Sequence, residues 1–131
     1  MSRRTELNEF ADDTPRFSAR DIENFGKSFL TAEQVRRKID AGESLAGIRI
    51  AGLDLRGVDL AGFDLTGAVI LDTDLAGARL RGARMSGAVL TTVDLSGADL
   101  SAADLSAALL TNVNGDGASL SGADLSGAIA T

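Results

Sequence analysis

The sequence predicts an all-β solenoid that is preceded by a short helical cap. Every residue whose number is a multiple of five from Leu45 to Leu125, except Gly115, is Leu, Ile or Met. A period of five matches neither the 3.6-residue turn of a helix nor the two-residue alternation of an ordinary strand. Outward apolar residues recur at intervals of twenty, from Val69 to Ile129. This spacing predicts that the chain closes one coil with every four pentapeptides.

The first part of the chain does not follow the repeat. Residues 1–17 are polar and contain the only proline, Pro15, so we expect a flexible tail that becomes ordered only against a partner. Ile22, Phe25 and Phe29 follow at spacings of three and four, which is typical of one face of a helix.

A second helix is predicted to begin after Thr31, because Gln34 three residues later completes a capping box. Gly42 is expected to end this helix. We therefore predict that residues 18–44 form a helical cap over the first coil of residues 45–131.

Each pentapeptide of residues 45–131 combines a short strand with a corner. Ala occupies ten of the seventeen positions that lie two residues before a multiple of five, from Ile48 to Ala128. Gly occupies twelve of the seventeen positions that lie two residues after one, from Gly47 to Gly127. The small–polar–Leu order predicts an in–out–in strand, and the polar–Gly pair that follows predicts a turn.

Residues 98–101 and 123–126, both ADLS, resemble the A-(D/N)-L-x-x signature of the pentapeptide-repeat proteins. The resemblance covers residues 45–131. It implies a right-handed quadrilateral β-helix with four pentapeptides per coil, in which the central Leu and the small residue two before it point inward.

The twenty-residue period predicts which side chains stack on the surface. The position immediately before a multiple of five is usually polar, but one column of these positions is apolar and nearly uncharged. An exposed apolar patch of this kind usually marks a contact surface. We call it the apolar face; with its flanking residues it comprises Val69, Leu71, Val89, Thr91, Leu109, Thr111 and Ile129.

The neighbouring column is acidic, and the chain as a whole has a formal charge of −6. We call this column the acidic face; it comprises Asp54, Asp74, Asp94 and Asn114. The negative balance argues against direct binding of nucleic acid. The resemblance suggests an alternative use, because some pentapeptide-repeat proteins imitate DNA and bind type II topoisomerases.

The last coil is predicted to be open. Gly115 interrupts the inner stack of leucines, and no later coil covers Leu120 and Leu125. An uncapped solenoid exposes strand edges and apolar side chains. We expect a partner or a second copy of the chain to cover this open end.

Composition leaves little room for catalysis or cofactors. The chain has no Cys and no His, so thiolate chemistry and the usual zinc sites are excluded. Residues 112–117 resemble the start of a calcium loop, but the expected distal Glu position is occupied by Ala123. We expect no catalytic residues, cofactor or metal. No secretory signal or membrane-spanning run is evident, so we expect a cytoplasmic protein that does not bind membranes.

These observations together predict a non-enzymatic protein–protein interaction module, and the family resemblance suggests a bacterial origin. We expect it to associate with itself, as a dimer or another homo-oligomer, through the apolar face or the open end. The first alternative is a DNA-mimicking inhibitor of a type II topoisomerase or another DNA-handling enzyme. The second alternative, an adaptor or targeting component of a bacterial secretion assembly, is suggested by the family resemblance alone.

Overall fold

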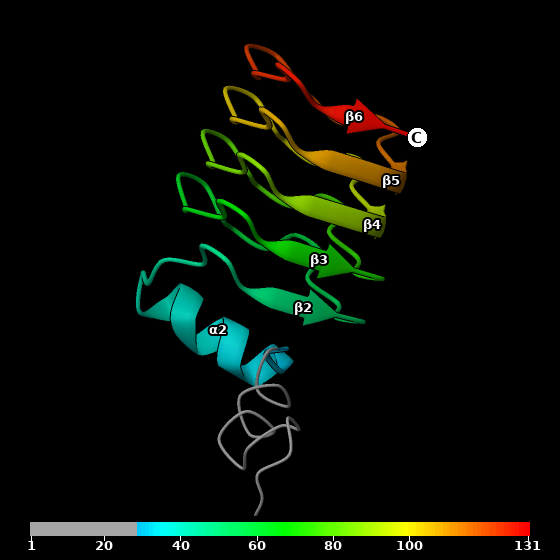
Figure 1. Cartoon of the computed structure of the whole chain (residues 1–131). Coiled ribbons are helices and arrows are strands. Elements are labelled where there is room, and N and C mark those ends of the chain that lie inside the picture. Colours follow the sequence, from blue (N-terminus) through cyan, green and yellow to red (C-terminus); the bar gives the residue numbers. More distant parts are fainter. Residues whose placement is uncertain (1–28) are drawn as a thin grey trace, which may run out of the picture.

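A computed structural model describes residues 29–131 and shows a parallel β-solenoid with one helix at its N-terminal end (Figure 1). The helix is α2 (Ala32–Asp40). One face of the solenoid carries a single parallel sheet in the order β2-β3-β4-β5-β6. Its strands are β2 (Arg49–Ala51), β3 (Val69–Leu71), β4 (Val89–Asp94), β5 (Leu109–Asn114) and β6 (Ile129–Ala130). The predicted fold class is confirmed.

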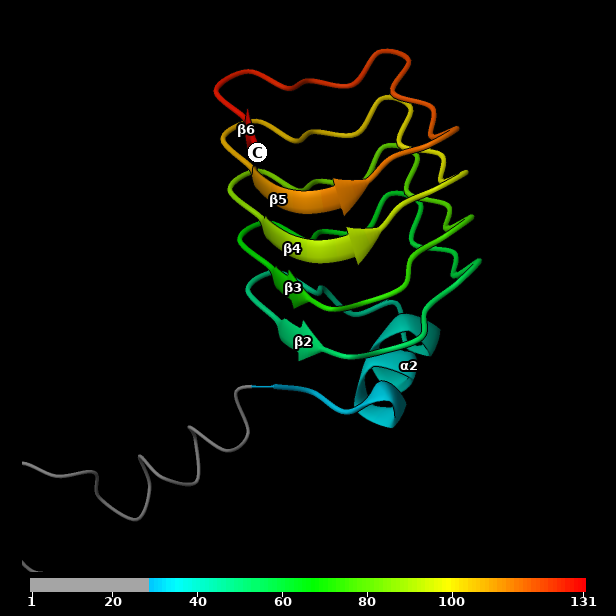
Figure 2. The same cartoon turned by 90° about the vertical axis from the view of Figure 1, so that its right-hand side faces the viewer.

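The register of the sheet confirms the predicted closure at twenty residues. Val69 pairs with Val89, and Leu109 pairs with Ile129. The other three sides of the coil are joined by isolated bridges with the same spacing, such as Asp59 with Arg79. The successive coils, which we call rungs, are therefore stacked directly above one another (Figure 2).

The corners depend on a left-handed backbone conformation at the position two residues after each multiple of five. Gly87 is typical, with φ of 69°. The five positions of this kind that lack glycine adopt the same conformation, with φ between 47° and 59°; they are Asp72, Thr92, Ala102, Ala107 and Asn112. For a residue other than glycine, the left-handed conformation costs about 1–2 kcal/mol. Stacking against the adjacent rungs must therefore hold these five residues in place.

The core is a stack of inward side chains on the four sides of the coil. Leu80, Met85 and Leu90 are completely buried on successive sides of the tube. The rungs are held together by backbone hydrogen bonds; for example, Leu80 N–H donates to the carbonyl of Asp99 at 2.7 Å. The inward hydroxyl of Thr73 donates to the carbonyl of Leu71 at 2.8 Å, which satisfies this buried polar group.

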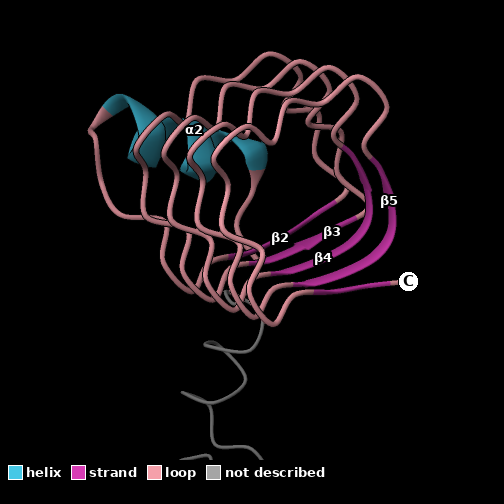
Figure 3. Ribbon diagram, turned by 90° about the horizontal axis from the view of Figure 1, so that it is seen from above, coloured by secondary structure: helices cyan, strands magenta, loops and turns pink. Residues whose placement is uncertain are grey.

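Helix α2 covers the N-terminal end of the core, as expected (Figure 3). The capping box is confirmed: Gln34 N–H donates to Thr31 Oγ1 at 3.1 Å, and Thr31 N–H donates to Gln34 Oε1 at 2.8 Å. Val35 is the buried residue of the helix, only 1% exposed. It packs with Leu45 and other residues of the first coil in the hydrophobic core.

The expectation that Phe29 lies on a helix is wrong. Phe29 forms a parallel bridge with Arg49, and Leu30 N–H donates to the carbonyl of Arg49 at 2.8 Å. The physical reason is that the edge of the first rung offers backbone partners that this short segment can use only when it is extended. Ile22 and Phe25, with the expected tail of residues 1–17, lie outside the described residues. The division into 1–17, 18–44 and 45–131 stays a prediction.

Candidate interaction surface

The apolar face lies on the sheet, in the register that the sequence predicts. Val69, Val89, Leu109 and Ile129 occupy one column, which crosses strands β3 to β6. The flanking residues Leu71, Thr91 and Thr111 form the neighbouring column.

Exposure of the apolar face increases toward the C-terminal end. Val69 and Val89 are half-buried. Leu109 is 39% exposed and Ile129 is 58% exposed. The part of the face with the largest free apolar area therefore adjoins the open end.

A contact that was not predicted from the sequence lies at the lower end of the apolar column. Arg49 pairs with Val69 in the sheet, and its guanidinium lies 5.1 Å from the centre of the Phe29 ring. A cation over an aromatic ring at this distance is attracted by the ring electrons. The twenty-residue period could have predicted this contact, because Phe29 and Arg49 are twenty positions apart.

The stacking of the acidic face is confirmed by bridges from Asp54 to Asp74 and from Asp74 to Asp94. Its charge, however, is partly neutralised by Arg56. Arg56 Nη2 lies 2.8 Å from Asp54 Oδ2, and Arg56 Nε lies 3.7 Å from Asp74 Oδ2. The hydrogen bonds to Asp54 and the charge of this carboxylate raise the pKa of Arg56. The hydrogen bonds that Arg56 donates lower the pKa of Asp54.

Two further columns place arginines above aspartates. Arg79 Nε lies 3.9 Å from Asp59 Oδ2, and Arg84 Nη2 lies 3.5 Å from Asp64 Oδ2. These are surface pairs, and such pairs contribute little to stability individually. They show that the charge is arranged as mixed ladders on these sides and not as a continuous negative stripe.

Many aspartates accept hydrogen bonds from the residue two positions later. Ser101 is typical: its hydroxyl and its N–H both donate to the carboxylate of Asp99. These bonds lower the pKa of Asp99, and equivalent bonds from Thr66, Ser96 and Ser126 lower the pKa of Asp64, Asp94 and Asp124. A carboxylate with a lowered pKa is ionised at neutral pH and is a poor general acid.

We expect these turns to make the fold sensitive to acid. Because the folded pKa of each carboxyl lies below its ordinary value of about 3.9, the unfolded chain binds protons first as the pH falls. The free energy of unfolding should therefore be level near neutral pH and should decline as the pH falls below about 5. Urea unfolding followed by circular dichroism at pH 7, 5, 4 and 3 measures this, and Asp99→Asn should flatten the profile. A midpoint unchanged from pH 7 to pH 3 would contradict the expectation.

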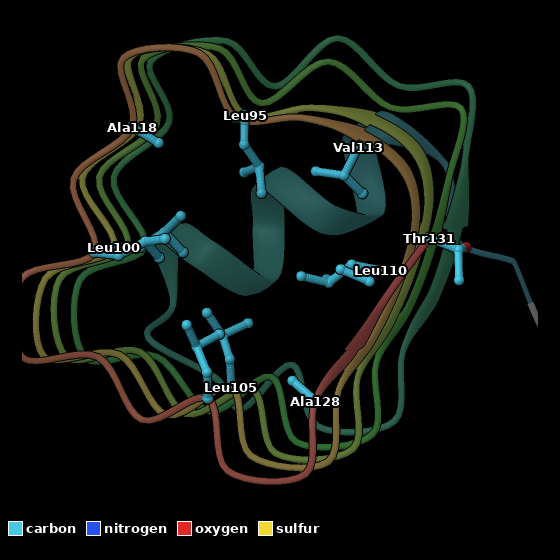
Figure 4. A pocket seen from close by; sticks show the side chains of 12 residues that line it. Leu95, Leu100, Leu105, Leu110, Val113, Ala118, Ala128 and Thr131 are labelled. Carbon is cyan, nitrogen blue, oxygen red and sulfur yellow. The ribbon is translucent and has the colours of Figure 1, made fainter.

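The open end contains a hollow of about 370 Å³ (Figure 4). Its floor includes Leu95, Leu100, Leu105 and Leu110 from the rung below. The three predicted open-end residues, Gly115, Leu120 and Leu125, all line it. Leu120 is 45% exposed and Leu125 is 42% exposed, so the structure brings these residues together on one exposed surface.

One residue of this end was missed. Ala130 lines the hollow on the side where Ile50, Ile70, Leu90 and Leu110 occupy the rungs below. The inward column therefore loses its large side chain in the last rung, as it does at Gly115. The five-residue repeat could have predicted this position, because Ala130 is the next multiple of five after Leu125.

The segment with a partial calcium-loop pattern is an ordinary corner. Asp116 N–H donates to Asn114 Oδ1 at 3.0 Å, as Ser96 N–H donates to Asp94 at 2.9 Å one rung below. Among residues 29–131, no three Asp or Glu side chains gather as ligands for a metal ion. The described part of the chain also contains no helix that is long and apolar enough to cross a membrane.

The repeat itself identifies the family. The family model described as Pentapeptide repeats, with eight copies, matches residues 54–91 and 94–129. The chain belongs to the pentapeptide-repeat family. No curated protein matches it closely enough to count as a relative.

Solved structures of other pentapeptide-repeat proteins are similar to this chain. Rfr23 from the cyanobacterium Cyanothece 51142 is 31% identical over 64% of this chain and 61% of its own, with a TM-score of 0.46. HetL from Nostoc sp. strain PCC 7120, involved in regulating heterocyst differentiation, is 30% identical over 76% of this chain and 46% of its own, with a TM-score of 0.44. The protein alr5209 from Nostoc PCC 7120 is 38% identical over 72% of this chain and 75% of its own, with a TM-score of 0.35. This chain thus spans about three-fifths of Rfr23 and less than half of HetL.

Proposed function

We propose that this pentapeptide-repeat protein is a non-enzymatic protein–protein interaction module that associates with itself through the apolar surface at its C-terminal end. The observation that carries the proposal is the continuity of this surface. Leu109 and Ile129 of the apolar face are exposed and lie beside the open end, where Leu120 and Leu125 are also exposed. Apolar area gathered on one side of a soluble domain is typical of a contact surface.

The chemistry of the chain supports a binding role over a catalytic one. It has no His or Cys to act as a base or a thiol nucleophile. The aspartates with shifted pKa values are shifted downward, by hydrogen bonds from their own turns. A general acid would need the opposite shift.

The proposal predicts an oligomer that a charge on the apolar surface disrupts. We expect light scattering after size-exclusion chromatography to give a mass above 13.5 kDa at high protein concentration. Leu109→Asp should shift this equilibrium toward the monomer by tenfold or more if the apolar face is buried in the contact. Arg79→Asp, on another side of the tube, is the control and should leave the mass unchanged. A chain that is monomeric at every concentration would contradict self-association, and an oligomer whose mass Leu109→Asp leaves unchanged would exclude the apolar face from the contact.

The acidic face supports a second candidate, imitation of DNA, more weakly. The stacked carboxylates of Asp54, Asp74 and Asp94 favour it, but Arg56 contacts the first two of them. A mimic of the phosphate backbone needs unneutralised charge to attract a DNA-binding surface. A supercoiling assay with a type II topoisomerase tests this candidate; inhibition that survives replacement of all three aspartates by Asn would rule out the electrostatic mechanism.

A further inference from the structure

The described part of the chain begins at the foot of the apolar face. Phe29 forms a parallel bridge with Arg49, and Arg49 pairs with Val69 in the sheet. The column continues above Val69 with Val89 and Leu109. Residues 1–28 are therefore connected to the solenoid directly below β2, on the side that carries the apolar face (Figure 2).

The sequence that precedes Phe29 has the pattern of a short amphipathic helix. Ser18 followed by Asp21 is a typical N-terminal cap, and Gly26 is a typical helix end. Ile22 and Phe25 are three positions apart, so they would share one side of this helix.

A helix of only two turns needs an apolar surface to pack on, because isolated helices of this length are marginal in water. Phe17 would add to its apolar side, since Phe17 and Ile22 occupy the two positions that form a hydrophobic staple at a capped N-terminus. Arg20, Glu23 and Asn24 fall on the far side. The helix would therefore present apolar groups to one surface and polar groups to water.

We propose that residues 17–28 fold back on the solenoid and that their helix packs on the lower part of the apolar face, over Val69 and Val89 of the same chain. Residues 26–28 are long enough to make the connection. Three extended residues span about 10 Å, which equals two rungs at about 4.8 Å each. This reach brings Phe25 to the level of Val69.

The spacing of the apolar residues in the helix matches the spacing of the rungs. Residues three apart in a helix differ in height by about 4.5 Å, at about 1.5 Å per residue. Successive rungs differ in height by about 4.8 Å. With Phe25 beside Val69, Ile22 therefore lies beside Val89, and the helix runs along the column.

The other surfaces that the segment could reach are charged. The acidic face carries stacked carboxylates, and the two remaining sides carry ladders of Arg and Asp. Helix α2 already covers the first coil, and it presents the exposed charges of Glu33, Arg36 and Arg37 to water. Packing of Phe25 on any of these surfaces would take water from charged groups without supplying opposite charges.

A tethered segment needs only a small contact. A connection of three residues gives the helix an effective concentration of about millimolar or more at the face, which a second molecule in dilute solution does not reach. The contact leaves Ile129, at 58% the most exposed residue of the apolar face, free for other partners. Docking of the segment thus goes beyond the proposed function and does not depend on self-association.

A single tryptophan tests the docking, because the chain has no Trp or Tyr. Phe25→Trp is prepared in the full chain and studied at a concentration at which light scattering gives the monomer mass. Its fluorescence emission should lie at a shorter wavelength than that of the same variant unfolded in urea. Adding Val89→Asp should return the emission to the unfolded wavelength, whereas adding Arg79→Asp, on the opposite side of the tube, should not. Emission at the unfolded wavelength in Phe25→Trp itself, or emission that Val89→Asp leaves unchanged, would overturn the proposal.

Cysteine cross-linking tests the register without placing a charge in the apolar face, and the chain has no Cys of its own. The full chain is prepared with Ile22→Cys and Val89→Cys together, and with Ile22→Cys and Arg79→Cys as the control. Oxidation should close a disulfide within one chain at least tenfold faster in the first pair, as measured by mass spectrometry. Equal rates for the two pairs would overturn the proposal. A disulfide that joins two chains through the first pair would show that a second copy occupies the face, which overturns the docking of the segment and retains the proposed function.

Discussion

Replacing Leu80 with alanine is expected to lower the free energy of unfolding by about 2–5 kcal/mol. Leu80 is completely buried in the middle of the solenoid, where rungs above and below it prevent the backbone from collapsing into the vacated space. The loss therefore combines the transfer of the side chain to water with the cost of the cavity. Urea unfolding monitored by circular dichroism measures it as a lower midpoint.

The repeat supplies a matched control for this experiment. Leu120 occupies the same side of the tube two rungs above Leu80, but it is 45% exposed. Leu120→Ala should cost about 1 kcal/mol or less, measured at a concentration low enough to keep the chain monomeric. Equal losses for the two variants would show that burial in the stacked rungs does not determine stability.

Val35→Asp should have the second large effect, because it places a charge beneath the helical cap. Val35 is 1% exposed and packs with the first coil through residues such as Leu45. An unpaired carboxylate in this position would cost about 3–5 kcal/mol, or would force α2 to leave the core. We expect a lower urea midpoint and a weaker helical signal at 222 nm.

Arg36→Asp is the control, since it introduces the same side chain at the next position of the helix, where it faces solvent. It should change the midpoint by less than about 1 kcal/mol. If both variants behaved alike, docking of α2 on the first coil could not be what stabilises the N-terminal end.

The sequence predicted the parts of the structure that depend on periodicity. The spacing of Val69, Val89, Leu109 and Ile129 was sufficient to predict which residues share a column, because a parallel sheet in constant register brings identical positions together. The Thr31 capping box was equally predictable, since both of its hydrogen bonds are local.

The parts that sequence alone did not predict depend on how side chains extend across rungs. Arg56 reaches from Asp54 to Asp74, and its direction is a matter of rotamers on an exposed surface. Phe29 was misassigned because its spacing from Phe25 fits a helix, whereas the backbone partner at Arg49 is twenty residues away. Competition between a local pattern and a distant edge is decided by tertiary structure, which a short sequence window does not contain.

The constant circuit length limits how such a chain can lengthen during evolution. A duplication of twenty residues would add one storey and leave every vertical stripe continuous. A duplication of five would turn all later storeys by a quarter of a circuit, so that the residue now at Val89 would stand above Asp74 instead of above Val69. The surface pattern of the tube would be broken at that point although the repeat remained perfect. Binding surfaces on this scaffold therefore constrain the number of repeats as well as their sequence.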